Sequence, residues 1–379
     1  MPQNQPQNRF IEDHRDEILD IAEPALGIVD NTSLKRFCMP FDTTEKEIRQ
    51  FVVNFINVAI EDESLKAKML QHFETFQLKK WISNDKPQLL GEVRPIKDKN
   101  EHVKKIDRWS YIGQKKLFGR VKTDLGVVRC VLHELFHSVS SKHDIDKIKQ
   151  HEQMVDQIKA EDKLKAEKRV LPAFETDKSI GEVESIFGEM LFNHIVETRL
   201  DDLKMNGKPL FGLPDDEILH RVEELKAEDL REFLGKSNET LDTNNHSDKE
   251  YWFRYVRGYE LATIIADKYK NDPENTMKNV GILLDNCHKM SPEDVARLFY
   301  TNSLEKGEGG TSYHQQAKNN FKEILSQKFS AYSIGPQIQT VHEQALREEI
   351  KIKQENKQRE IQTDMQKSAE DIQQERQNG

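Results

Sequence analysis

The segment from Leu125 to Val139 constrains the fold of this chain more than any other part of the sequence. Asp124, which directly precedes it, can cap the N-terminus of a helix. The sequence therefore predicts a buried amphipathic helix that starts after Asp124. The apolar residues that recur at helical spacing and would form its buried stripe are Leu125, Val128, Val131, Leu132, Leu135, Phe136 and Val139.

The same helix carries the pattern His-Glu-x-x-His. His133 and His137 are four residues apart, so they share one face of a helix and both imidazoles can reach a single cation. Glu134, between them, can then address the water of that cation. The pattern predicts a zinc site with the two histidines as ligands and Glu134 as the catalytic base.

Two ordinary helix histidines, one in the core and one at the surface, are the alternative interpretation of this pattern. The pattern is short, and with this composition chance alone would produce it in roughly one such chain in twenty-five. An apolar helix surrounds the motif, however, and acidic residues that could supply a third ligand follow it. Both observations favour the metal site.

Asp144 is the first candidate for the third ligand. It follows His137 by seven residues, so a straight helix would carry it about 10 Å away at ~1.5 Å per residue. The helix must therefore end between them, and Ser138, Ser140 and Ser141 are weak helix formers that favour a turn there. The alternative is an aspartate in an exposed loop.

Glu184 is the second candidate, on a helix expected from Gly181 to Leu200. On a helical wheel Glu184 lies at the flank of the apolar stripe, whereas Glu182 and Glu189 point well away from that stripe. A carboxylate beside an apolar face needs a partner. The partner can be the zinc, a histidine that the carboxylate orients, or a surface lysine, and the choice between Asp144 and Glu184 stays open.

The rest of the pattern predicts an α+β fold that is mostly helical. Apolar residues recur at helical spacing from Phe10 to about Lys80, and short apolar stretches between Pro87 and Arg120 are interrupted by Gly, Pro and Lys. The first region predicts helices and the second the few strands of a small sheet. The zinc motif would lie on the helix that follows this sheet.

Domain organisation follows from composition. The composition predicts a disordered tail at residues 1–9, a single catalytic domain at 10–335 and a polar helical C-terminal tail at 336–379. A charged segment at 145–179 resembles an insertion, and the polar stretch 236–249 predicts a loop at a possible subdomain junction.

Charge and hydropathy limit the partners. A formal net charge of -10 repels nucleic-acid backbones, and no stretch approaches the roughly 18 consecutive apolar residues that a membrane span needs. The N-terminus lacks the pattern of a secretory signal, and the three scattered cysteines fit a reducing compartment. We therefore expect a protein substrate, no nucleic acid and no membrane span.

The residues from His133 to Asp144 resemble HExxHxxTxxxD, the zinc signature of the NleC-type effector metalloproteases that bacterial pathogens inject into host cells, with Ser140 in the place of Thr. Ile180 to Glu184 is similar to an Ile-Gly-x-x-Glu segment of that family. The resemblance implies a zincin-like catalytic domain with Asp144 as third ligand. With Glu184 as ligand the site would instead resemble a gluzincin, as in thermolysin.

In that family a downstream tyrosine joins the metal site, but this chain has no tyrosine between Tyr111 and Tyr251. Tyr255, Tyr259 and Tyr313 are the candidates to stabilise an oxyanion. The family also implies export by a specialised secretion system into a host cytosol, where the chain would act on a host protein. A cytoplasmic peptidase is the alternative location.

The sequence thus predicts a zinc-dependent endopeptidase. The alternative from another class is a non-catalytic helical scaffold that binds partners through its acidic, coiled-coil-like C-terminal tail. Zinc content distinguishes the two.

Overall fold

A computed structural model describes residues 40–329 apart from 83–88, 100–101, 151, 154–179, 181, 205–206, 243–245 and 306–311. The tails expected at 1–9 and 336–379, and most of the charged segment 145–179, lie outside the described residues. Within the described residues the chain is mostly helical with a small mixed sheet, so the predicted α+β class is confirmed.

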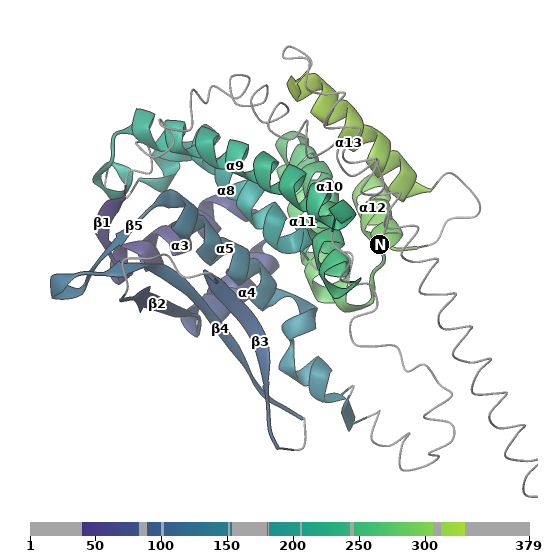
Figure 1. Cartoon of the computed structure of the whole chain (residues 1–379), viewed down its shortest axis with the longest axis horizontal. Coiled ribbons are helices and arrows are strands. Elements are labelled where there is room, and N and C mark those ends of the chain that lie inside the picture. The colour runs from purple at the N-terminus through teal and green to yellow at the C-terminus, as the bar shows by residue number, and fades with distance from the viewer. Residues whose placement is uncertain are drawn as a thin grey trace, which may run out of the picture.

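The described elements are named as in Figure 1. The strands are β1 (Phe41–Thr44), β2 (Gln77–Trp81), β3 (Gly91–Lys97), β4 (Val103–Lys115) and β5 (Arg120–Thr123). The helices are α3 (Glu45–Ala59), α4 (Glu63–Glu74), α5 (Leu125–Val139), α8 (Val183–Leu203), α9 (Asp215–Asp242), α10 (His246–Asn271), α11 (Pro273–Asn286), α12 (Pro292–Thr301) and α13 (Tyr313–Phe329).

The five strands form one sheet around the long strand β4. The order is β1-β5-β4-β2, and β3 pairs with the N-terminal part of β4. The β2–β4 pair is parallel and the other pairs are antiparallel. Helix α5 packs on β3 and β4 with one side and on α8 with the other, so it lies between the sheet and the C-terminal helices (Figure 1).

Helix α5 begins and ends as the sequence predicts. The carboxylate of Asp124 accepts a hydrogen bond from the backbone N–H of Val127 at 3.1 Å, which satisfies one of the free donors of the first turn. The helix ends at Val139, and Ser140 turns to extended backbone. The predicted end between His137 and Asp144 is therefore confirmed.

The predicted N-terminal helix is confirmed as α3. Thr44 and Glu47 form a capping box at its start, in which each side chain satisfies a backbone donor of the other residue. Burial of its apolar stripe stabilises the fold by about 1.5–3 kcal/mol for each large side chain. The stripe consists of Ile48, Phe51, Val52, Phe55 and Ile56, all fully buried.

Two expectations about the fold need correction. Strands β1 and β2 lie in the region expected to be helical, because four or five residues are too few to produce a readable period. The polar stretch 236–249 is helical in its described residues, since α9 continues to Asp242 and α10 starts at His246, while residues 243–245 lie outside the described residues. The polar composition of 236–242 and 246–249 belongs to the ends of two neighbouring helices.

Candidate metal centre

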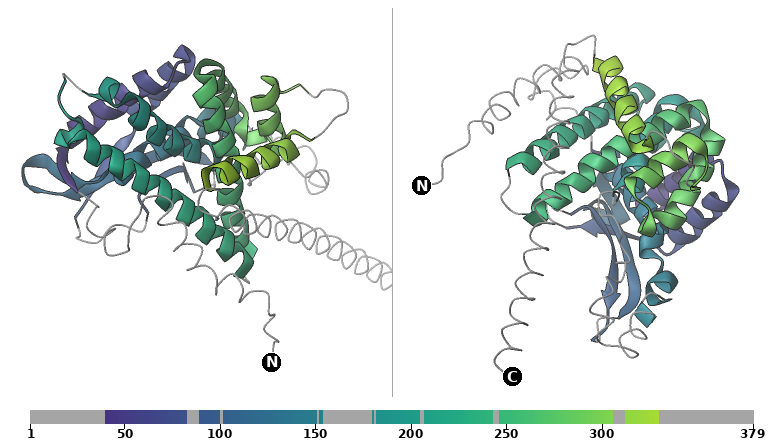
Figure 2. Two further views of the ribbon diagram at one scale, coloured as in Figure 1. Left: turned by 90° about the horizontal axis from the view of Figure 1, so that it is seen from above. Right: turned by 90° about the vertical axis from the view of Figure 1, so that its right-hand side faces the viewer.

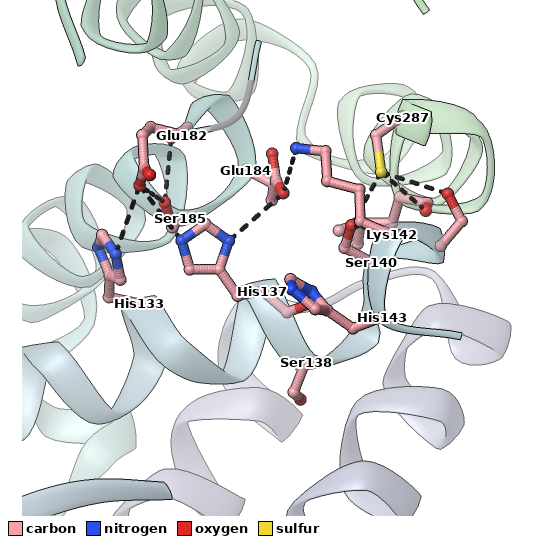
Figure 3. Close-up of polar contacts among 12 residues, drawn as sticks. His133, His137, Ser138, Ser140, Lys142, His143, Glu182, Glu184, Ser185 and Cys287 are labelled. Atoms are coloured by element: carbon pink, nitrogen blue, oxygen red, sulfur yellow. Dashed lines mark hydrogen bonds and ion pairs between the residues drawn. The ribbon is translucent and has the colours of Figure 1, made fainter. Parts of the chain in front are cut away.

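Three side chains from α5 and the start of α8 converge on one point. The candidate ligand atoms of His133, His137 and Glu182 all lie within 4.8 Å of one another. Oε2 of Glu182 is 3.2 Å from Nε2 of His137 and 3.7 Å from Nε2 of His133. Figure 3 shows the two imidazoles side by side on α5 and facing this carboxylate.

Glu182 reaches the histidines because of its place in the chain. It is the N-cap residue of α8, with non-helical backbone angles, so its side chain does not follow the helical wheel. The hydroxyl of Ser185 donates to Oε2 of Glu182 at 3.2 Å, which fixes the orientation of the carboxylate. Helices α5 and α8 pack against each other along their length and hold the three residues together.

The outer nitrogen of each imidazole faces a second carboxylate. Nδ1 of His133 lies 2.7 Å from Oε1 of Glu189, and Nδ1 of His137 lies 3.4 Å from Oε1 of Glu184. A proton held on Nδ1 of His133 by Glu189 leaves the lone pair of its Nε2 free to bind a metal. Nδ1 of His137 makes no hydrogen bond among the described residues, so its contact with Glu184 is an ion pair only.

A buried ion pair supports Glu189. The guanidinium of Arg129, on α5, lies 2.7 Å from Oδ1 of Asp229 on α9 and 3.6 Å from Oε2 of Glu189. Asn193 also donates to Asp229 at 3.3 Å. Because one guanidinium contacts both carboxylates, the position of Glu189 beside His133 depends on three helices.

Lys142 supports Glu184 in a similar way. Its Nζ atom lies 3.2 Å from Oε1 of Glu184, a carboxylate that is completely buried. The Oε2 atom of Glu184 has no hydrogen-bond partner among the described residues. A buried carboxylate is costly unless it is paired, so Lys142 and His137 together explain why Glu184 is tolerated there.

The charges of this cluster are strongly coupled. Burial alone would lower the pKa of His137, but the charge of Glu182, the hydrogen bond between Glu182 and His137, and the nearby carboxylate of Glu184 raise it well above its usual value. Burial would raise the pKa of Glu182, and the contacts with His137 together with the charges of His133 and Lys142 more than reverse that effect. Two imidazoles and a carboxylate held in this way form the His2Glu donor set that catalytic zinc sites use. The residues present therefore fit a zinc ion.

Glu134 lies beside the cluster and against β3. Burial raises the pKa of its carboxyl, although the charges of His133 and His137 act in the opposite direction. A Cβ atom added to Gly91, the first residue of β3, would lie 2.3 Å from Cγ of Glu134. The glycine therefore gives the Glu134 side chain the space in which it lies.

The structure separates the two candidates for third ligand from the cluster of three. Asp144 lies past the end of α5, and its Oδ1 accepts from the backbone N–H groups of Asp146 and Lys147 at 3.0 and 3.2 Å, as an N-cap does. Glu184 contacts the outer nitrogen of His137, which is the orienting position that the sequence left open. Glu182 occupies the place expected for a ligand.

The tyrosine candidates differ in their surroundings. Burial raises the pKa of Tyr259, and the charges of Asp229 and Glu189 act in the same direction against that of Arg129. Tyr255 packs against the hydrophobic core. Tyr313 lies at the start of α13, where its ring stacks on Tyr300 with 6.4 Å between centroids.

Sequence reasoning missed Glu182 and Glu189 because it searched for one apolar face on α8. This helix packs against α3, α5, α9 and α10, so it is buried on most sides and its apolar stripe does not mark the side that faces the site. The polar residues Ser185 and Glu189, four residues apart on one face of α8, mark that side, and Glu182 precedes them as the N-cap residue.

Comparison of the chain with protein-family models, with curated proteins and with solved structures gave no match. Among the described residues, no helix combines the length and the apolar character needed to cross a bilayer.

Proposed function

We propose that the protein is a zinc-dependent endopeptidase. The observation that carries this proposal is the convergence of the Nε2 atoms of His133 and His137 on Oε2 of Glu182, with Glu134 beside them. His133, His137 and Glu182 would hold the zinc. A bound zinc ion would lower the pKa of its water to near neutrality and polarise a substrate carbonyl.

Glu134 would act as the general base. Its carboxylate takes a proton from the attacking water and passes it to the amine that leaves when the peptide bond breaks. Proton transfer is most effective when the pKa of the base lies near the working pH, and burial moves the pKa of Glu134 upward, in that direction. Tyr259, which lies near Glu189, is the candidate donor to the oxyanion.

The sheet supplies a place for an extended substrate. Among the described residues, β3 pairs only with β4, so its other edge carries backbone groups that a peptide strand can pair with. This edge begins at Gly91, next to Glu134. A peptide bound there as an added strand would run past the general base.

The proposed substrate is a host protein, and the proposed route is export by a specialised secretion system. Both rest on the resemblance of His133 to Asp144 to the effector signature. Glu182 as ligand would make the metal centre more similar to that of a gluzincin, in which a glutamate from a following helix completes the site.

Zinc content and cleavage test the proposal together. The full-length protein should contain near-stoichiometric zinc by mass spectrometry, and a cell lysate incubated with it should gain new protein N-termini. Glu134→Gln should retain the zinc and produce none of these N-termini, whereas His133→Ala should lose the zinc. New N-termini that persist with Glu134→Gln would refute the role of Glu134.

A non-catalytic scaffold is the second candidate, because the histidines and carboxylates neutralise one another even without a metal. Such a network can stabilise a helix packing as an ordinary buried ion cluster. A wild-type protein that binds no zinc and generates no new N-termini would favour this candidate.

A further inference from the structure

The three most exposed large apolar side chains among the described residues gather at one end of the sheet. They are Ile82, Leu117 and Phe118, with exposed fractions of 84%, 80% and 98%. Single exposed apolar residues are ordinary on protein surfaces, but a group of them marks a site of interaction. We call these three residues the apolar tip.

The sheet topology places the apolar tip at the turn between β4 and β5. Leu117 and Phe118 lie within this turn. Strand β2 runs parallel to β4 with Trp81 opposite Gln114, so Ile82, the next residue, is carried to the same end. In Figures 1 and 2 the turn between β4 and β5 projects beyond the other described elements.

The exposure of Leu117 and Phe118 is not required by the conformation of their turn, as a second copy of the tripeptide Leu-Phe-Gly shows. Leu-Phe-Gly occurs at 117–119 and at 210–212, with φ of 58° and 54° at the phenylalanines. In the second turn the ring of Phe211 stacks on Phe41 with 4.6 Å between centroids, and Leu210 is buried. The same backbone thus buries its apolar residues in one place and presents them to solvent in the other.

Basic residues surround the apolar tip. Lys115, Lys116, Arg120 and Lys122 flank it and are all exposed. The Nζ atom of Lys116 lies 2.6 Å from a carboxylate oxygen of Asp42. The four basic residues still leave a net positive charge around the apolar tip, although the formal net charge of the whole protein is -10. An apolar protrusion with cations at its base matches an anionic lipid surface, where apolar groups enter the acyl region and cations meet the head groups.

We propose that the apolar tip docks the protein onto anionic phospholipid membranes. The projecting shape favours a membrane over an acidic protein, because a fluid bilayer accepts a protruding side chain without a complementary pocket, whereas a protein partner must supply one. This inference concerns a surface outside the metal centre and does not depend on the proposed peptidase activity.

Vesicle flotation of the full-length protein tests the proposal. We expect it to float with vesicles of phosphatidylcholine and phosphatidylserine but not with phosphatidylcholine alone. Leu117→Ala with Phe118→Ala should lower the apparent partition coefficient at least about tenfold. Lys115→Glu with Lys122→Glu should lower it by about fivefold or more for each residue, and added salt should weaken wild-type binding.

Matched controls separate this site from general charge and hydrophobicity. Lys104→Glu with Lys105→Glu makes the same charge change at the other end of β4, where both residues are exposed, and Val53→Ala shortens an exposed apolar residue on α3. Both should float as the wild type does. The proposal would be overturned if the wild-type protein did not float with the anionic vesicles, or if the control variants lost as much binding as the variants of the apolar tip. Either result would point to an acidic protein partner.

Discussion

Gly91 and Glu134 lie so close together that a single methyl group would not fit between them. A Cβ atom built on Gly91 would meet Cγ of Glu134 at 2.3 Å and its carboxyl carbon at 2.8 Å. The start of β3 and the proposed general base are therefore in direct steric contact. The free edge of β3, where a substrate would bind, and the carboxylate of Glu134, which would transfer the proton, therefore cannot shift independently.

Gly91→Ala should therefore lower activity without removing the metal. The added methyl group must displace Glu134, and a misplaced catalytic group can cost about 100-fold in rate. We expect kcat/KM to fall by ~10–100-fold while zinc content is unchanged. Gly281→Ala is the control, because a Cβ at that helical position meets nothing within 4 Å. Full activity in Gly91→Ala would contradict this account of the contact.

Substitution of each acidic residue in turn should identify the third ligand. Glu182→Gln should reduce zinc affinity the most, because it removes the charge that faces both Nε2 atoms. Glu184→Gln should reduce it by about 10–100-fold, as expected for a residue that orients a ligand. Asp144→Asn should leave it nearly unchanged. Competition with a fluorescent chelator measures all three, and a larger loss for Asp144→Asn would restore the sequence-based assignment.

Breaking the Arg129–Asp229 pair should destabilise the fold. Both side chains are largely buried, and removing one charge leaves the other unpaired, at a cost of about 3–5 kcal/mol. Urea denaturation of Asp229→Asn should show this decrease in the free energy of unfolding. Lys226→Met, which removes the partly exposed pairs with Glu197 and Glu223, should cost less, about 1 kcal/mol.

His72 should make stability depend on pH. Burial, together with the charges of Arg108 and Lys68, lowers its pKa from 6.5 to about 4. Between these values the unfolded chain binds more protons than the folded one, so the free energy of unfolding should fall as the pH drops from about 6.5 to about 4. After allowance for partial exposure we expect a decrease of roughly 1–3 kcal/mol.

His72→Gln should flatten this part of the stability profile, and His102→Gln, the same substitution at an exposed histidine, is the control. Chemical denaturation at several pH values in the presence of a chelator measures the profile without a contribution from bound metal. An unchanged slope in His72→Gln would show that other groups cause the acid sensitivity.

The sequence predicted those parts of the structure that depend on local rules. Asp124 caps α5 as expected, and the apolar stripe of the helix is buried, because capping and periodicity require only neighbouring residues. His133 and His137 share a face for the same reason. The role of these residues in zinc binding and catalysis stays a prediction.

Glu182 could not be found by the same rules. Its side chain starts from non-helical backbone just before α8, and what brings it to His137 is the packing of α8 on α5, which is a tertiary contact. Glu189 depends in the same way on Arg129 and on Asp229, which is 40 residues further along the chain. The apolar period of the sequence does not record contacts of this range.

The placement of Glu182 at the N-cap of α8 also sets how such a site can be recognised in other chains. Among the described residues, the connection between His137 and Glu182 supplies no member of the cluster of three, so the three residues themselves do not fix its length. A search pattern with a fixed spacer would miss relatives, whereas HExxH followed at any distance by Glu-x-Glu-x4-Glu would retain both the three converging groups and the two carboxylates behind the imidazoles.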